Sequence, residues 1–115
     1  MGKFALFAFK GDAMCFVHVL LNALDMKEKG IEVRIVIEGE AAKLIPDFSA
    51  AAGPLKPLFE KARGLNLIDG VCMACSGKLG TLEAARSMGL NLLNEMSGHP
   101  AMGRYLKEGY QVITF

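Results

Sequence analysis

The sequence predicts an α/β protein whose parallel sheet is covered by helices on both faces. Short apolar segments alternate with segments in which apolar residues recur at helical spacing, a pattern typical of βαβ units. Glycines separate most of these segments. The 115 residues, of which 52% are hydrophobic and 22% charged, can form the core of one domain and argue against disorder.

The N-terminal half contains two predicted strands and three predicted helices. Residues 3–9 form a nearly continuous apolar run, as expected for a parallel strand buried on both faces. Asp12 is a candidate N-cap for a helix that starts at Ala13, and Gly30 ends that helix. The other elements expected here are a strand over 31–37, a short helix over 41–45 ended by Pro46, an irregular loop over 47–53 and a helix over 54–63.

The C-terminal half continues the alternation. Its expected elements are a strand over 65–72, a small-residue turn over 76–81, a helix over 81–89, a short strand over 90–93, a helix over 101–107 and a strand over 110–115. Right-handed crossovers bring the carboxyl ends of parallel strands to one edge. That edge, where open α/β folds bind ligands, would hold the segments 10–12, 38–40, 72–78 and 94–98.

Two cysteines at C-x-x-C spacing are the most informative feature of the chain. Cys72 ends the third predicted strand and Cys75 follows it, next to small residues. A thiol close to the start of the following helix is expected to favour the reactive thiolate, which attacks sulfur or carbon electrophiles. The alternative is that both cysteines are small buried hydrophobic residues.

Four other residues are candidates for this site. His99, which we expect at a helix start, could steer an anionic persulfide or transfer a proton, or it could be a local cap. Lys10 and Lys78 could stabilise the negative sulfur, although lysines on loops are usually solvated. Asp12 could contribute to binding, or act only as an N-cap.

Metal and nucleotide sites are not predicted. The chain has no second cysteine pair, and Cys15 and His99 would complete no recognised ligand spacing. Cys15 is instead expected to be packing on the first helix. The segment 77–81 resembles a phosphate loop, but Leu79 stands where Ser or Thr is required.

Charge and hydropathy argue against nucleic acids and membranes as partners. The net charge is +1 and basic residues form no cluster. The apolar run over 4–9 is too short for a signal peptide, and the uncharged run over 13–24 is too short to span a bilayer. We therefore expect a cytoplasmic protein with reduced thiols.

The order of several features along nearly the whole chain resembles the DsrE/DsrF/TusD-type family of small sulfur-relay proteins. These features are the opening strand 4–9, the Gly11-Asp12 turn, the segment 70–75 with Gly80 after it, the segment 98–102 and the ending 109–115. The resemblance implies one Rossmann-like domain over residues 1–115, a three-layer α/β/α sandwich with a mainly parallel five-stranded sheet. It also implies a homotrimer or hexamer that meets sulfur donor and acceptor proteins and needs no cofactor.

In the relay proteins that the chain resembles, a cysteine after the third strand carries a persulfide. Its spacing to a later glycine matches Cys72 and Gly80, so the resemblance assigns the carrier role to Cys72. Cys75 could resolve the persulfide by forming a disulfide. Two alternatives stay open, a thiol–disulfide redox protein that uses both cysteines and a non-catalytic assembly module. Methionines that would line subunit contacts in such a module are Met14, Met73, Met96 and Met102.

Overall fold

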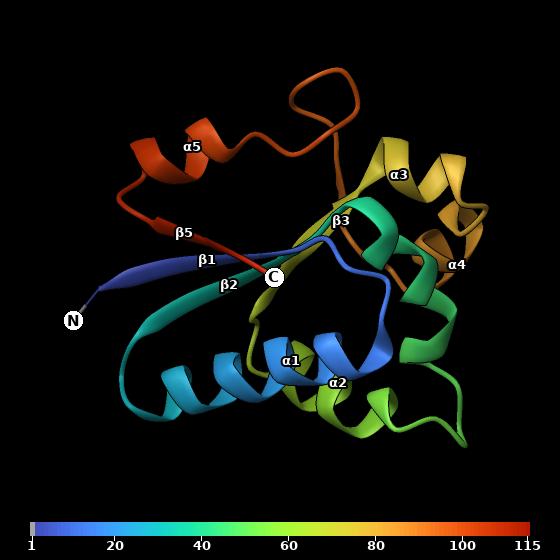
Figure 1. Cartoon of the computed structure of the whole chain (residues 1–115), viewed down its shortest axis with the longest axis horizontal. Coiled ribbons are helices and arrows are strands. Elements are labelled where there is room, and N and C mark those ends of the chain that lie inside the picture. The colour runs from blue at the N-terminus through green and yellow to red at the C-terminus, as the bar shows by residue number, and fades with distance from the viewer. Residues whose placement is uncertain (1) are drawn as a thin grey trace.

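A computed structural model describes residues 2–115 (Figure 1). In this range five strands form one sheet in the order β4-β3-β2-β1-β5, and every neighbouring pair is parallel. The strands are β1 (Lys3–Ala8), β2 (Glu32–Ile37), β3 (Ile68–Cys72), β4 (Leu92–Leu93) and β5 (Gln111–Thr114). The predicted α/β class with a parallel five-stranded sheet is confirmed.

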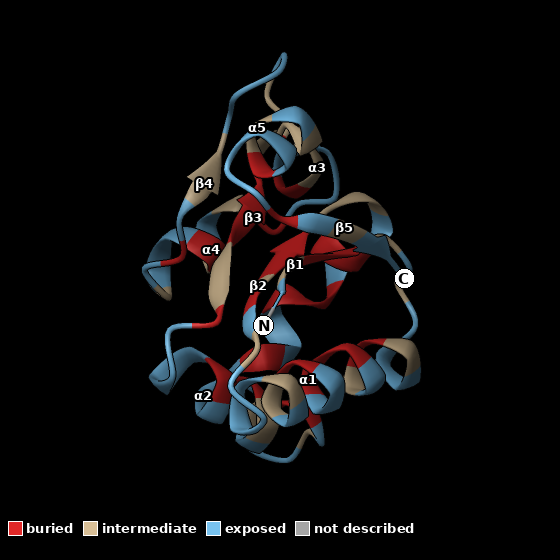
Figure 2. Cartoon of the chain, turned by 90° about the vertical axis from the view of Figure 1, so that its left-hand side faces the viewer, coloured by how far each residue is buried: buried red, intermediate tan, exposed pale blue. Residues whose placement is uncertain are grey.

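Helices cover both faces of the sheet. They are α1 (Ala13–Glu28), the 3-10 helix η1 (Gly39–Phe48), α2 (Leu55–Gly64), α3 (Met73–Lys78), α4 (Leu82–Ser87) and α5 (Met102–Lys107). Figure 2 shows the buried strands between α5 on one side and α1 and α2 on the other. This arrangement confirms the three-layer α/β/α sandwich.

Side chains that point alternately to the two faces of the sheet form two separate hydrophobic cores. On β1, Leu6 packs with the larger core under α1, α2 and η1, whereas Phe7 packs on the opposite face. There Phe7 meets Tyr105 of α5 edge to face, with ring centroids 5.3 Å apart. Because successive side chains of a strand point to opposite faces, a fully apolar strand such as β1 serves both cores.

The order of the strands determines how the chain crosses the sheet. β1 to β4 progress toward one edge, and Ala85 of α4 joins α1, η1 and α2 in the core of one face. α5 lies on the other face and leads back to β5 beside β1. The segment 94–101 must therefore pass over the carboxyl ends of the strands to reach α5, as Figure 1 shows.

The turn predicted over 76–81 is wrong in its first half, because α3 occupies Met73–Lys78. Cys72 acts as the N-cap of this helix, and its Sγ accepts a hydrogen bond from the backbone N–H of Cys75 at 3.3 Å. The hydroxyl of Ser76 donates to the Cys72 carbonyl at 2.8 Å. These local bonds stabilise a short helix whose small residues are also typical of turns.

Two other boundaries differ from the prediction by three residues. The helix expected over 41–45 is a 3-10 helix over Gly39–Phe48 that includes Pro46, so the irregular loop begins only at residue 49. β3 begins at Ile68 rather than at residue 65, because Asn66 takes a left-handed conformation with φ of 65°. No helix within residues 2–115 is both long and apolar enough to cross a membrane.

Candidate functional site

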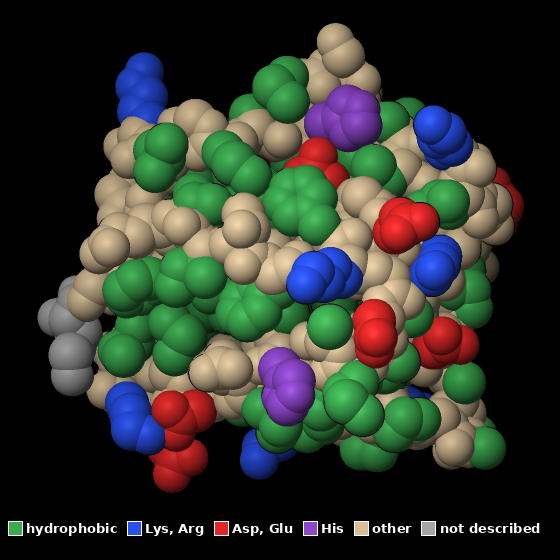
Figure 3. Space-filling model, viewed as in Figure 1, with side chains coloured by type: hydrophobic (Ala, Val, Ile, Leu, Met, Phe, Trp, Pro, Cys, Tyr) green, Lys and Arg blue, Asp and Glu red, His purple; other side chains and the backbone are tan. Residues whose placement is uncertain are grey.

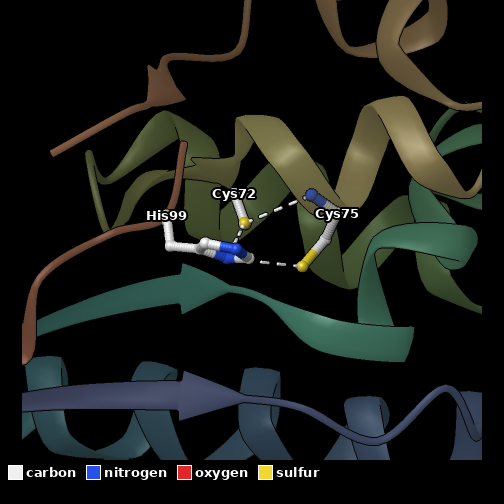
Figure 4. Close-up of side chains that lie close together, drawn as sticks. All are labelled: Cys72, Cys75 and His99. Atoms are coloured by element: carbon white, nitrogen blue, oxygen red, sulfur yellow. Dashed lines mark hydrogen bonds between the residues drawn. The ribbon is translucent and has the colours of Figure 1, made fainter. Parts of the chain in front are cut away.

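Three side chains from two separate parts of the chain meet at the carboxyl end of β3 (Figure 4). Cys72 is the last residue of β3, Cys75 lies in the first turn of α3, and His99 lies in the loop between β4 and α5. The Nδ1 atom of His99 is 3.1 Å from Cys72 Sγ and 3.9 Å from Cys75 Sγ. The two sulfur atoms and this nitrogen all lie within 4.8 Å of one another.

Glu38 adds a carboxylate to this group. It follows the last residue of β2, the strand next to β3, and its Oε2 is 3.5 Å from Nδ1 of His99. The side chain is 12% exposed. Burial raises the pKa of Glu38, and the nearby imidazole of His99 opposes that rise.

The conformation of the loop brings His99 to the thiols. Ser97 and Gly98 both have positive φ, and Met96 and His99 form an antiparallel bridge around them, as in a tight hairpin turn. The backbone N–H of Ala74 donates to the Gly98 carbonyl at 2.8 Å, which fastens the turn to α3. A Cβ at Gly98 would lie 2.9 Å from the Ala74 Cβ, so this close approach depends on glycine.

The helix expected over 101–107 is observed over Met102–Lys107, but His99 does not start it as expected. α5 begins at Met102, and His99 belongs to the hairpin turn that precedes it. Its side chain is 37% exposed, so the ring has one side toward the thiols and another toward solvent. The hypothesis that His99 lies near the cysteines is nevertheless confirmed, because its Nδ1 atom is 3.1 Å from Cys72 Sγ and 3.9 Å from Cys75 Sγ.

Charged residues outside the site fix both ends of the loop. The Arg104 guanidinium of α5 bonds to Glu95 and reaches Asp69 of β3 at 3.4 Å. The backbone N–H of Ala101 donates to Glu95 Oε1 at 3.3 Å. The hydrogen bond from Arg104 lowers the pKa of Glu95, which keeps this carboxylate charged. The Tyr105 hydroxyl donates to Asp69 and completes the link from α5 to β3.

The environment of Cys72 favours the thiol rather than the expected thiolate. The residue is 0% exposed, and burial raises the pKa of its thiol from 9.0 to about 12. The N–H of Cys75 lowers this pKa, but burial and the nearby Cys75 and Glu38 outweigh it. The expectation of a thiolate at Cys72 is therefore wrong, because one backbone donor cannot compensate for the loss of water. Cys75, by contrast, is partly exposed.

This arrangement supports two kinds of chemistry. An imidazole nitrogen within reach of a thiol can accept its proton and increase its nucleophilicity. Whether Nδ1 donates or accepts depends on the tautomer of His99. Two cysteine sulfurs and a histidine nitrogen are also the ligand types that zinc prefers. Cys72, Cys75 and His99 are thus the residues that could hold a metal ion.

Lys10 and Asp12 do not join the thiols. They line a separate hollow of about 470 Å³. Asp12 caps α1, since its Oδ1 accepts hydrogen bonds from Met14 N at 2.8 Å and Cys15 N at 3.4 Å. The remaining lining residues of this hollow are Gly11, Glu40 and Lys43. The N-cap interpretation of Asp12 is confirmed, and Lys10 is exposed to solvent.

Lys78 and Cys15 also lie apart from the cluster. Lys78 is exposed in the last turn of α3, whereas Cys72 is at the start of that helix. Cys15 lies on α1, half-buried, and is not among the residues that meet His99. Of the two residues weighed as additional metal ligands, Cys15 and His99, only His99 meets the cysteine pair.

An apolar pocket adjoins the Glu38 side of the site. It has a volume of about 450 Å³, and Glu38 is its one charged lining residue. Its other lining residues are Phe9, Met96, Pro100, Ala101, Met102 and Gly103. Figure 3 shows one face of the molecule, on which hydrophobic side chains gather among scattered charged ones.

Residues 38–40 were expected at this edge, but Glu38 was not predicted to be a site residue. Its position directly after the second strand was visible in the sequence. The missing information was the strand order, which makes β2 the neighbour of β3. The network of Glu95, Arg104 and Asp69 was missed for the same reason, because its members come from three different elements.

Comparison with known proteins gives relatives without an assigned activity. No model of a known protein family matches the chain. The uncharacterized protein MJ0733 of Methanocaldococcus jannaschii is 38% identical over 97 residues, which cover 84% of this chain and 77% of that protein. An uncharacterized protein of Archaeoglobus fulgidus is 41% identical over 39 residues, 34% of this chain and 64% of its own length. A second one is 40% identical over 37 residues, 32% of this chain and all of its own length.

Proposed function

Because the chain belongs to the same family as the uncharacterized protein MJ0733, whose name assigns no activity, we propose its function from the site itself. The protein is a sulfur-relay protein of the DsrE/DsrF/TusD type that carries a persulfide on a cysteine. The observation that carries the proposal is His99 Nδ1, which lies 3.1 Å and 3.9 Å from the sulfurs of a C-x-x-C pair. A base this close to two thiols is suited to thiol transfer chemistry.

Cys75 is the thiol that receives and delivers sulfur. Transfer between two proteins requires the carrier sulfur to meet a sulfur of the partner, and Cys75 is partly exposed whereas Cys72 is 0% exposed. The thiolate is the attacking form, and the raised pKa of Cys72 makes that form scarce. This assignment differs from the family resemblance, which gives the carrier role to Cys72.

Uptake is a displacement at the outer sulfur of a donor persulfide. His99 Nδ1 accepts the thiol proton of Cys75, and the resulting thiolate forms a bond to that outer sulfur while the donor S–S bond breaks. The donor leaves as a thiolate, which takes the proton from His99. In delivery an acceptor thiolate attacks the outer sulfur, and Cys75 leaves as a thiolate. Neither step needs an external oxidant or reductant.

The high pKa of Cys72 favours a carrier over a thiol–disulfide redox protein. If Cys72 attacked the inner sulfur of a persulfide on Cys75, a disulfide would form and sulfide would leave. That attack requires the Cys72 thiolate, and a thiol with a pKa of about 12 is almost wholly protonated at neutral pH. A persulfide on Cys75 therefore has time to meet its acceptor.

We also propose, from the resemblance alone, that the chain forms a homotrimer or hexamer and meets separate donor and acceptor proteins. Of the four methionines considered for subunit contacts, Met14 and Met96 are exposed, whereas Met73 and Met102 are half-buried. Exposed methionines suit adaptable contacts. Light scattering coupled to gel filtration gives the number of subunits directly.

Intact-mass spectrometry after incubation with a small persulfide donor tests the relay. Wild type should gain about 32 Da, the mass of one sulfur atom. Cys75→Ser should lose this gain, and Cys72→Ser should keep it. Cys15→Ser is the matched control, because Cys15 is also half-buried but lies apart from His99.

Two other results would change the assignment. A gain that is lost only in Cys72→Ser would keep the relay and move the carrier to Cys72. No uptake by any form, or uptake that depends on Cys15, would contradict the relay. The chain would then be better explained as an assembly module.

A further inference from the structure

We propose that Cys72, Cys75 and His99 form a binding site for a soft d10 metal ion of the zinc class. This inference does not rest on sulfur transfer. Within residues 2–115, these three residues are the group of possible ligands whose donor atoms all lie within 4.8 Å of one another. The donor set is two sulfurs and one imidazole nitrogen, which zinc binds at about 2.3 Å and about 2.0–2.1 Å respectively.

The distances from the imidazole nitrogen to the two sulfurs are within about 0.5 Å of those in tetrahedral coordination. At those bond lengths and tetrahedral angles, a sulfur and a nitrogen ligand are about 3.6 Å apart and two sulfurs about 3.8 Å apart. Nδ1 of His99 is 3.1 Å from Cys72 Sγ and 3.9 Å from Cys75 Sγ. The distance from Nδ1 to Cys72 Sγ must lengthen, and the distance from Nδ1 to Cys75 Sγ must shorten, by a few tenths of an ångström. Small side-chain rotations supply such changes.

The backbone already holds the three ligands in place. Cys72 is buried at the end of β3, and the cap at the start of α3 fixes Cys75 one turn later. The N–H of Ala74 binds the Gly98 carbonyl at 2.8 Å and so fastens the turn that carries His99. Because the site is largely formed before the ion arrives, binding orders few additional groups.

The donor atoms also determine the class of the ion. Thiolate sulfur and imidazole nitrogen favour zinc and copper(I), whereas magnesium and calcium require oxygen ligands. Glu38 brings its carboxylate within 3.5 Å of His99 Nδ1, but it is not one of the three residues that converge. Three protein ligands leave a fourth position for water or for an added thiol, as in reactive rather than purely structural zinc sites.

Metal and persulfide would compete for the same sulfur atoms. A zinc-bound Cys75 thiolate is less free to attack a donor, and a persulfidated Cys75 no longer offers the same ligand. Zinc is therefore expected to block sulfur uptake, and loading with sulfur is expected to weaken zinc binding. Thiol chemistry at this site would thus depend on the supply of free metal.

Cobalt(II) titration of the full-length, reduced protein tests the site, because cobalt reports both its geometry and its ligands. Wild type should bind one ion per chain and show tetrahedral visible bands with thiolate-to-cobalt charge transfer. Competition with a chromophoric chelator then gives the zinc affinity. Cys75→Ser, Cys72→Ser and His99→Asn should each weaken zinc by roughly 100-fold or more, since even residues that only support ligands cost 10–100-fold.

Controls and outcomes separate this inference from the relay. Cys15→Ser and His18→Asn, which alter the same residue types on α1, should bind zinc within twofold of wild type. An octahedral spectrum without charge transfer, or equal affinity in Cys75→Ser and wild type, would overturn the metal site. Circular dichroism checks that the variants are folded. Zinc binding without persulfide uptake would leave the metal site standing and remove the relay, and uptake without zinc binding would do the reverse.

Discussion

Two neighbouring regions at the carboxyl edge of the sheet both contain segments that follow strands in the sequence, but they differ in structure. One is the thiol site, formed by Cys72, Cys75, His99 and Glu38. The other is the charged hollow, lined by Lys10, Gly11, Asp12, Glu40 and Lys43. Glu38 and Glu40, separated by Gly39 alone, belong to different regions. Charged residues at a functional edge are therefore not sufficient evidence of a site.

The difference arises from burial and from long-range contacts. The thiol site includes a 0% exposed cysteine and is closed by a loop that crosses the edge from β4 to α5. In the charged hollow, Asp12 satisfies the backbone N–H groups at the start of α1, and Lys10 is solvated. The first region raises the pKa values of Cys72 and Glu38, and the second provides local helix stability.

Gly98→Ala should have the largest effect on stability, because it disturbs the loop that closes the thiol site. The substitution places a side chain at φ of 90° and puts its Cβ 2.9 Å from Ala74. Strain and overpacking together should cost about 2–4 kcal/mol. Urea unfolding measures the loss. Gly103→Ala in α5, where a Cβ meets nothing within 4 Å, is the control and should be neutral or stabilising. Equal costs in the two variants would contradict the role of the turn.

Alkaline pH should destabilise the thiol site through Cys72. Its folded-state pKa of about 12 lies above the ordinary 9.0, so the folded state keeps this proton where the unfolded state loses it. The stability due to this difference is present below about pH 9 and is lost as pH rises toward 12, by up to about 1.4 kcal/mol per pH unit. Unfolding of Cys72→Ala across this range should show a shallower decline than wild type or Cys15→Ala. Parallel curves for all three proteins would argue against a buried, protonated Cys72.

Asp12→Ala tests the charged hollow. Loss of the N-cap of α1 should cost about 1 kcal/mol, and Asp12→Asn should largely restore it, because Asn also accepts from the backbone. Neither variant should change the rate of sulfur uptake by more than about twofold, which corresponds to a change of about 0.4 kcal/mol in the activation free energy. A loss of uptake in Asp12→Ala with normal stability would make the hollow part of the functional site.

Glu38→Gln should slightly stabilise the protein, whereas the substitutions at Gly98 and Asp12 should destabilise it. The raised pKa of Glu38 means that its carboxylate is less favourable in the folded state, so the stability present below pH 4.5 is lost as pH rises through the folded-state pKa. Glu38→Gln should therefore be more stable than wild type at pH 7, and the gain should vanish below pH 4.5. Exposed Glu40→Gln should be neutral. Thermal unfolding at the two pH values measures both variants.

Local signals in the sequence were sufficient for most of the fold. The apolar run of β1, the cap at Asp12 and the alternation of elements predicted the α/β class and the parallel sheet. The same local signals predicted the short and irregular elements less well. α3 was missed because its small residues are also typical of turns, and η1 was misjudged because Pro46 does not end a 3-10 helix. Such short elements depend on contacts with their neighbours.

The candidate site was predictable in its cysteines and only in part beyond them. The C-x-x-C spacing at a strand end identified Cys72 and Cys75. The rule that the carboxyl ends of parallel strands meet at one edge predicted that His99 lies near them. Three facts required the structure: the burial of Cys72, the placement of β2 beside β3 that supplies Glu38, and the crossing of the loop over both. Lys10, Asp12 and Lys78 also belong to segments that were expected at this edge, but they do not join the thiol site.

The central claim is that Cys75 is the reactive thiol, because it is partly exposed and within 3.9 Å of His99 Nδ1, whereas Cys72 is buried and protonated. Alkylation mapped to single cysteines tests this claim most directly. At neutral pH, limiting iodoacetamide should label Cys75 first, Cys15 more slowly and buried Cys72 least. His99→Asn should slow labelling of Cys75 by roughly 10-fold or more and leave Cys15 unchanged, whereas His18→Asn should change neither. Labelling of Cys72 or Cys15 ahead of Cys75, or a Cys75 rate indifferent to His99, would contradict the account.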